Sequence, residues 1–154
     1  MKKPVPDNRM TPQAFGRRQE YVVIAELLKR GFDVFKTLVD DKKIDCVIRL
    51  SDKKYLDVQI KARSIYAKHP TFFAGMRIEP RPNYWFIFFT EANDTFWVMP
   101  SSKVIELGHT LKSGENVGKA EINMPKSDRS SNAPKFEKYK NNFDLLNIKP
   151  KEKR

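Results

Sequence analysis

A row of polar side chains on one face of an expected strand is the densest group of residues in this sequence that could do chemistry. Between residues 55 and 63, polar and apolar residues alternate with the two-residue period of a half-buried strand. Asp57, Gln59 and Lys61 share one face of it, at steps of about 7 Å. A carboxylate, an amide carbonyl and an ammonium group in such a row could hold a divalent cation and orient a water molecule. A solvated strand face is the alternative interpretation.

Two further carboxylates lie where the local pattern favours apolar side chains. Glu20 falls within the apolar stripe of an expected helix, between Ile24 and Leu27 in angle, and Gly16 one turn earlier leaves room for another backbone or a ligand. Asp45 begins a strand whose opposite face is uniformly apolar. A buried carboxylate is costly unless it is paired, protonated or bound to a cation. A structural ion pair with a lysine or arginine for Glu20, and a turn-capping role for Asp45, are the alternatives.

Together these residues form the set that phosphodiester hydrolysis requires. Glu20, Asp45 and Gln59 offer hard oxygen ligands of the kind that Mg²⁺ or Mn²⁺ prefers. Lys61 can point at the same centre, where it could orient or deprotonate water and face the developing negative charge. We therefore predict a catalytic centre built from Glu20, Asp45, Gln59 and Lys61.

One α/β domain over residues 11–146 is expected to position this centre. Thr11 and Pro12 predict a helix start, and Gly31 predicts its end after about Arg30. The helix carries an apolar stripe of Val23, Ile24, Leu27 and Leu28. Expected strands cover residues 32–36, 44–50, 55–63, 84–90 and 95–99, with further helices at 103–107 and 134–146.

The remaining segments carry weaker patterns. Residues 64–83 are compatible with a short helix or a long loop, and residues 108–133 are expected to be a loop. Residues 1–10 are expected to be a flexible arm, and residues 147–154 a basic tail. The second and third strands are expected to form a hairpin, and the strand at 84–90 to be buried on both faces.

The pentapeptide Gly-Arg-Arg-Gln-Glu at 16–20, followed by Asp45 and by Gln-Ile-Lys at 59–61, resembles the PD-(D/E)XK nuclease superfamily. That group includes restriction endonucleases and archaeal Holliday-junction resolvases, and the likeness spans roughly residues 12–146. It implies a restriction-endonuclease-like αβββαβ core, in which helices flank a mixed central sheet. It also implies an endodeoxyribonuclease that cleaves phosphodiester bonds with one or two Mg²⁺ or Mn²⁺ ions.

The resemblance assigns roles to individual residues. Glu20 matches the helix glutamate, Asp45 the metal-binding aspartate and Lys61 the motif lysine. Gln59 departs from the Asp or Glu that the superfamily more often has, although active Mrr-like nucleases also carry glutamine there. This departure removes one negative charge, which lowers the expected metal affinity. Asp57, two residues earlier on the same face, would compensate as a metal ligand or else is a plain surface aspartate.

The charge of the whole chain favours DNA as the partner. Thirty Lys and Arg against 19 Asp and Glu give a net charge of +11, and such a domain attracts polyanions. Anionic membrane is disfavoured, because the best helix carries Glu20 on its apolar face. The single cysteine, Cys46, and an N-terminus without an apolar run predict an intracellular, cytoplasmic protein. The residues expected to contact DNA phosphates, or otherwise to be solvated, are Arg17, Arg63, Lys68, Arg77 and Arg81.

Three functions remain to be distinguished. The leading prediction is an active metal-dependent DNA endonuclease, which could work as a homodimer. The second is a non-catalytic nucleic-acid-binding module on the same fold, which Gln59 favours. The third is a structural or assembly protein whose basic surface meets another protein. Duplex, branched, nicked and single-stranded DNA all remain open as substrates.

Overall fold

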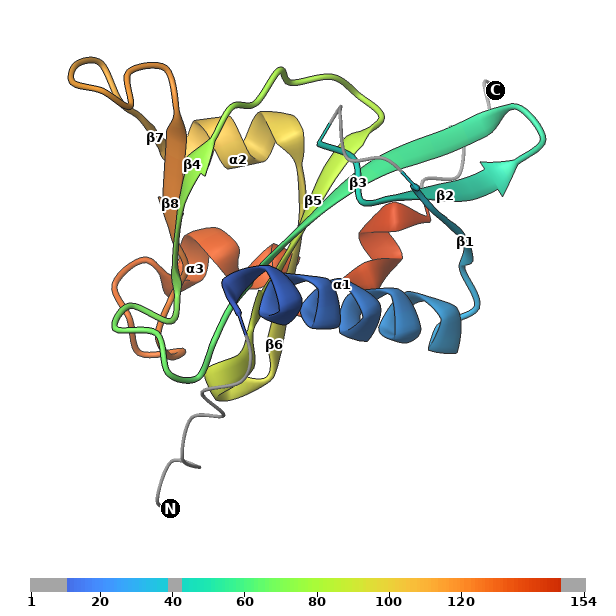
Figure 1. Cartoon of the computed structure of the whole chain (residues 1–154), viewed down its shortest axis with the longest axis horizontal. Helices are drawn as coiled ribbons and strands as arrows, with labels where there is room; N and C mark the ends of the chain where they lie inside the picture. Colours follow the sequence, from blue (N-terminus) through green and yellow to red (C-terminus); the bar gives the residue numbers. More distant parts are fainter. Residues whose placement is uncertain (1–10, 39–42, 148–154) are drawn as a thin grey trace.

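The computed structural model describes residues 11–38 and 43–147, which form two β-sheets with flanking helices (Figure 1). The expected arm at 1–10 and residues 148–154 of the expected tail lie outside the described residues. The main sheet has the order β1-β2-β3-β5-β6. Its strands are β1 (Asp33–Lys36), β2 (Cys46–Ser51), β3 (Lys54–Arg63), β5 (Tyr84–Thr90) and β6 (Thr95–Pro100).

Helix α1 (Pro12–Lys29) has the boundaries that its capping residues predict. The Thr11 hydroxyl accepts a hydrogen bond from the Ala14 N–H at 3.1 Å, which satisfies one of the unpaired donors of the first turn. At the other end Gly31 adopts a φ of +86°, and the Phe32 N–H donates to the Leu27 carbonyl at 3.1 Å. This Schellman arrangement turns the chain directly into β1.

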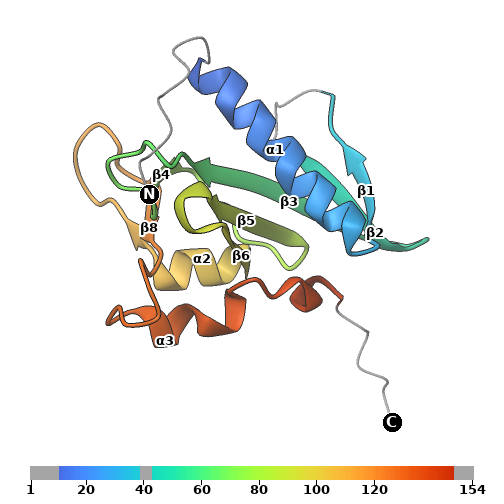
Figure 2. The same cartoon turned by 90° about the horizontal axis from the view of Figure 1, so that it is seen from below.

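The buried stripe of α1 differs from the expected one at its two ends. Val23, Ile24 and Leu27 are buried as predicted, but Leu28 is 54% exposed and Gln19 is buried. The prediction that Leu28 belongs to the buried stripe is wrong. At about 100° per residue, Leu28 lies at the edge of the face that contacts the sheet. The stripe packs on the main sheet, and Figure 2 shows α1 covering one face while α2 and α3 lie on the other.

The main sheet is mixed, as predicted. β2 and β3 form the expected antiparallel hairpin, with Cys46 opposite Val58. β3 and β5 then run parallel, with Gln59 opposite Phe86. Every residue of β5 is buried, because Trp85, Ile87 and Phe89 face the α1 layer while Tyr84, Phe86 and Phe88 face the opposite core.

A second sheet lies beside the main one (Figure 1). It corrects the expected loop at 108–133 and the short helix or long loop expected at 64–83. It has the order β4-β8-β7, with β4 (Phe72–Met76), β8 (Ala120–Asn123) and β7 (His109–Thr110). These strands are short, so their sequence shows little alternation for a pattern to detect. Helix α2 (Ser101–Leu107) connects the two sheets and begins two residues before the expected position.

The expectation of one continuous helix at 134–146 is wrong. The segment contains α3 (Ala133–Phe136) and two 3₁₀ turns, η2 (Glu137–Tyr139) and η3 (Phe143–Leu146). Between the turns, the Asn141 N–H donates to the Phe96 carbonyl at 2.7 Å and the Asn141 side chain accepts from the Phe96 N–H at 2.9 Å. Pairing with the open edge of β6 therefore replaces helical hydrogen bonds here. None of the helices within 11–38 and 43–147 is long and apolar enough to cross a membrane.

Candidate active site

The polar row of β3 lies on the face of the main sheet that points away from α1. Val58 and Ile60 pack in the core beneath α1, so Asp57, Gln59 and Lys61 leave the strand on the opposite side. Gln59 is only 8% exposed, whereas Asp57 and Lys61 are partly exposed. A solvated strand face therefore does not describe Gln59, whose amide lies at the boundary between core and surface.

Asp45 lies against the middle of this strand. Its carboxylate is 7% exposed, and its Oδ2 accepts the Ile60 N–H at 2.6 Å. β2 begins only at Cys46, so from this point β3 has no further partner strand on that side. The carboxylate thus satisfies a backbone donor that a longer β2 would have satisfied with a carbonyl. This bond holds Asp45 beside the strand that carries Gln59 and Lys61.

Glu20 forms an ion pair that the alternative interpretation anticipated. The Lys36 Nζ lies 3.1 Å from its Oε2, and both side chains are about one-third exposed or less, at 33% and 27%. Lys36 stands opposite Cys46 in the β1–β2 register. The pair therefore lies near the start of β2. Cys46, the strand residue opposite Lys36, directly follows Asp45 in the sequence.

The pKa of the Cys46 thiol is shifted by its burial and by the charged side chains near the start of β2. Burial is the main reason that its pKa rises from 9.0 to about 12, and the negative charge of Asp45 raises it further. Lys36 acts in the opposite direction and Glu20 adds a smaller increase. The ion pair of Lys36 with Glu20, and the position of Lys36 opposite Cys46, place Glu20 at the end of β2 that Asp45 precedes. Cys46 itself is a core residue, as expected.

Tyr84 connects Gln59 to the segment before β2. Its hydroxyl lies 2.9 Å from Gln59 Oε1 and 3.0 Å from the Lys43 carbonyl oxygen. The ring is 3% exposed and belongs to the core beneath β5. Sequence patterns did not single out Tyr84, because its partner depends on the parallel register of β3 and β5, which local periodicity does not report.

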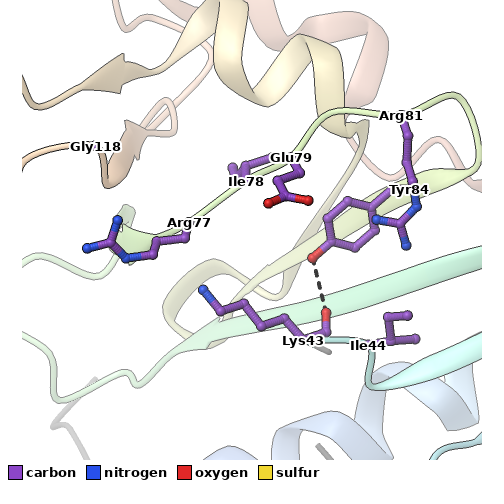
Figure 3. A pocket seen from close by; sticks show the side chains of 8 residues that line it. All are labelled: Lys43, Ile44, Arg77, Ile78, Glu79, Arg81, Tyr84 and Gly118. Carbon is purple, nitrogen blue, oxygen red and sulfur yellow. Dashed lines mark hydrogen bonds between the residues drawn. The ribbon is translucent and has the colours of Figure 1, made fainter. Parts of the chain in front are cut away.

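A basic pocket of about 660 Å³ opens beside Tyr84 (Figure 3). Figure 3 shows the side chains of Lys43 and Glu79 reaching into the space between Arg77 and Arg81. Three cationic side chains line the pocket against one carboxylate, Glu79, and Asp57 pairs with one of them, Arg81; the balance is still positive. Its remaining lining residues are Ile44, Ile78, Tyr84 and Gly118.

Arg81 links the pocket to the polar row of β3. Its guanidinium lies 2.6 Å from Asp57 Oδ2 and 4.4 Å from the ring centre of Tyr84. The buried Ser101 hydroxyl holds the backbone of Arg81, accepting from its N–H and donating to its carbonyl, both at 3.1 Å. Asp57 therefore positions Arg81 in this structure, and its role as a metal ligand stays a prediction.

The other residues expected to contact DNA lie away from the pocket lining. Arg63 Nε donates to the His69 carbonyl at 3.3 Å, near the end of β3. Lys68 is exposed in the connection to β4, and Arg17 is exposed on α1. The structure thus places Arg77 and Arg81 together with Lys43, which sequence reasoning did not single out, and separates them from Arg63, Lys68 and Arg17.

Oxygen ligands are few in the candidate centre. Among residues 11–38 and 43–147, no three His, Cys, Asp or Glu side chains lie close enough together to hold a metal ion. The predicted oxygen ligands are therefore two carboxylates, Glu20 and Asp45, and the Gln59 carbonyl. Glu20 approaches from the α1 side of the sheet and Gln59 lies on the opposite face, so a centre shared by all three stays a prediction. All three are hard oxygen donors, which suit Mg²⁺ or Mn²⁺ better than the softer metals.

No protein-family model and no curated protein matches the sequence. Among solved structures, the bacterial homing endonuclease I-Ssp6803I matches with a TM-score of 0.66 and 20% identity, over 90% of this chain and 94% of that chain. Hjc, a Holliday junction resolvase from Archaeoglobus fulgidus, matches with a TM-score of 0.48 and 13% identity, over 71% of this chain and 84% of that chain.

The match to the homing endonuclease bears on the fold and not on the individual side chains. The expected homodimer and cytoplasmic location stay predictions. The likeness to the homing endonuclease, together with the mixed sheet and its flanking helices, confirms that this chain has the predicted restriction-endonuclease-like fold.

Proposed function

We propose that this protein is a Mg²⁺- or Mn²⁺-dependent DNA endonuclease of the PD-(D/E)XK superfamily. One observation carries the proposal: the hydrogen bond from the Ile60 N–H to Asp45 Oδ2, at 2.6 Å. It holds a buried carboxylate against β3, the strand that carries Gln59 and Lys61, and this supports the arrangement that the sequence motif predicts. The shared fold with a homing endonuclease supports the same conclusion.

The donor set fits a divalent cation in its chemistry. Asp45 and Gln59 are 7% and 8% exposed, and an anionic oxygen held in such surroundings gains from a nearby cation. Glu20 would complete the set from the α1 side of the sheet. A bound cation would polarise the scissile phosphate and acidify an attacking water molecule.

The chain's own residues would bind and orient the substrate. Lys61 extends from the same face of β3 as Gln59, where its Nζ can donate to a water molecule or to a phosphate oxygen. Lys43, Arg77 and Arg81 would hold neighbouring phosphates of the DNA backbone at the pocket. Contacts of this kind position a strand without reading its sequence, so they leave the shape of the substrate open.

Cleavage of labelled DNA with Mg²⁺, with Mn²⁺ and with a chelator tests the proposal directly. Duplex, four-way junction, nicked and single-stranded forms are compared in parallel. We expect metal-dependent cleavage of at least one form, and loss of cleavage in Lys61→Ala and Asp45→Asn. Lys53→Ala, in the exposed turn between β2 and β3, is the matched control and should cleave normally. A wild-type protein that binds DNA without cleaving any of these forms contradicts the proposal.

A non-catalytic nucleic-acid-binding module is the second candidate. The ion pair between Lys36 and Glu20 favours it, because a protein cation already balances one of the two carboxylates. Gln59 favours it as well, since an amide brings no negative charge to a cation site. Calorimetric titration with Mn²⁺ separates the two candidates: heat of binding supports the nuclease, whereas DNA binding without any Mn²⁺ binding supports the module.

A further inference from the structure

The Tyr84 hydroxyl lies within hydrogen-bond distance of two acceptor oxygens but has only one proton to donate. The Tyr84 hydroxyl lies 3.0 Å from the Lys43 carbonyl oxygen and 2.9 Å from Gln59 Oε1. Both of these oxygens are acceptors, and a phenol has one proton to donate. The two acceptors therefore compete for it, and the side chains of Tyr84 and Gln59 are only 3% and 8% exposed.

Turning the Gln59 amide over resolves the competition. The amide nitrogen and oxygen have nearly the same shape, so the group fits either way. With Nε2 towards Tyr84, Gln59 donates to the phenol oxygen, and the phenol donates to the Lys43 carbonyl, which can only accept. The amide nitrogen, the phenol oxygen and the Lys43 carbonyl oxygen are then linked by two hydrogen bonds without competition. The amide oxygen is left at the end of the side chain that faces away from the phenol.

We propose that Tyr84 is a positioning residue that orients the Gln59 amide, so that Oε1 rather than Nε2 faces the cation. This inference rests on the metal centre of the proposed function. An aspartate or glutamate at this position needs no such device, because its two oxygens are equivalent. Glutamine needs it, because an NH₂ group turned towards the cation would repel it. Tyr84 thus makes glutamine usable at position 59.

The Tyr84→Phe variant tests this role, because it removes the hydroxyl and keeps the ring. Mn²⁺ affinity is measured by calorimetry in four proteins: wild type, Tyr84→Phe, Gln59→Glu, and the double variant. We expect Tyr84→Phe to weaken Mn²⁺ binding by about tenfold, the scale of lost contacts to a metal ligand. In the Gln59→Glu background we expect less than about a twofold effect, because a carboxylate has no wrong orientation. Tyr55→Phe, exposed on β3, is the matched control.

The double variant also distinguishes two possible causes of a loss of Mn²⁺ affinity: a misoriented Gln59 amide, and a displaced Lys43 segment. Tyr84→Phe removes the donor to the Lys43 carbonyl in both backgrounds. An equal loss of affinity in both would therefore assign the effect to that segment and overturn the inference. No loss in either background would overturn it as well.

A second measurement keeps the inference testable without any metal. In the metal-free protein, the side-chain NH₂ signals of Gln59 are assigned by nuclear magnetic resonance as those missing from Gln59→Glu. We expect Tyr84→Phe to shift them, because Nε2 loses the phenol oxygen as its acceptor. Unchanged signals would overturn the amide orientation. If the signals shift but the protein binds no Mn²⁺, the proposed amide orientation stands and the metal centre of the proposed function is rejected.

Discussion

At the scale of single residues, Asp45 combines a structural bond with the predicted chemistry. Its Oδ2 accepts the Ile60 N–H, and the same carboxylate is a predicted metal ligand. An asparagine retains an oxygen that can accept this hydrogen bond but loses the charge. An alanine loses both, which leaves a buried backbone donor without its partner. The two substitutions therefore separate the structural role from the catalytic one.

We predict that Asp45→Ala lowers the free energy of unfolding by about 1–3 kcal/mol, the cost of an unsatisfied buried donor. Asp45→Asn should cost less than about half as much, because the acceptor remains. Both variants should lose metal-dependent cleavage. Urea unfolding followed by circular dichroism gives the stabilities. Equal destabilisation by the two substitutions would show that the charge, and not the hydrogen bond, stabilises this part of the sheet.

Cys46 gives a prediction about alkaline pH. Its pKa in the folded protein is raised to about 12 from 9.0, so the unfolded chain loses the thiol proton first as the pH rises. The stabilisation is complete below pH 9 and is lost progressively between about pH 9 and 12, by up to about 1.4 kcal/mol per pH unit. Cys46→Val should remove this component. Urea unfolding of both proteins between pH 8 and 10.5 measures it, and parallel pH profiles would contradict the prediction.

The sequence identified the candidate ligands but not the residues that orient them. Glu20 and Asp45 stand out because they lie where the local pattern favours apolar residues, and Gln59 and Lys61 because they gather on one strand face. Lys36 and Tyr84 do not stand out, because their partners are set by pairing between strands that are distant in the sequence. A single sequence holds no record of that register, so the ion pair and the tyrosine contact required the structure.

At the scale of elements, strong local patterns predicted α1, the β2–β3 hairpin and β5, whereas weak ones failed. α1 carries both caps and a continuous stripe, and β5 is a seven-residue apolar run. The second sheet has strands of two to five residues, and its two sides join segments far apart in the chain. The segment at 133–146 contains helix-forming residues, but tertiary pairing with β6 overrides that preference.

Asn141 is the residue that makes this override possible. Its φ of +49° suits asparagine better than most side chains, and its amide caps the edge of β6 at Phe96. We predict that Asn141→Ala destabilises the protein by about 2 kcal/mol, from the lost hydrogen bond and the strained backbone together. Asn141→Gly should cost about 1 kcal/mol, because glycine tolerates the positive φ.

Thermal unfolding of both variants measures the difference, with the exposed Asn83→Ala as the control. The expected result is that Asn141→Ala lowers the stability more than Asn141→Gly does. Glycine worse than alanine would mean that the segment gains more from restricted backbone freedom than from relief of the positive φ.

At the scale of the whole molecule, the net charge of +11 does not say where DNA binds. Thirty cationic residues are spread over the chain, and many of them are paired with carboxylates, such as Arg18 with Glu91 and Arg49 with Asp33. Arg81 is also paired, with Asp57. The pocket differs in position, because Lys43, Arg77 and Arg81 gather beside the strand that carries the candidate centre. Their position beside the candidate centre, and not the total charge, is the reason that we predict contacts between these three residues and the DNA backbone.

The dependence of DNA affinity on salt distinguishes contacts at the pocket from general attraction. Each phosphate contact releases condensed counterions, so removing one lowers the slope of log K against log salt by about 0.9. We predict this change for Arg77→Ala, and a smaller one for Arg81→Ala, because Asp57 already neutralises Arg81 in the free protein. Lys53→Ala removes the same charge from an exposed turn and should leave the slope unchanged. Fluorescence anisotropy between about 50 and 200 mM salt measures all three variants. If Lys53→Ala changes the slope as much as Arg77→Ala does, the attraction is diffuse, and the pocket is not where the phosphates bind.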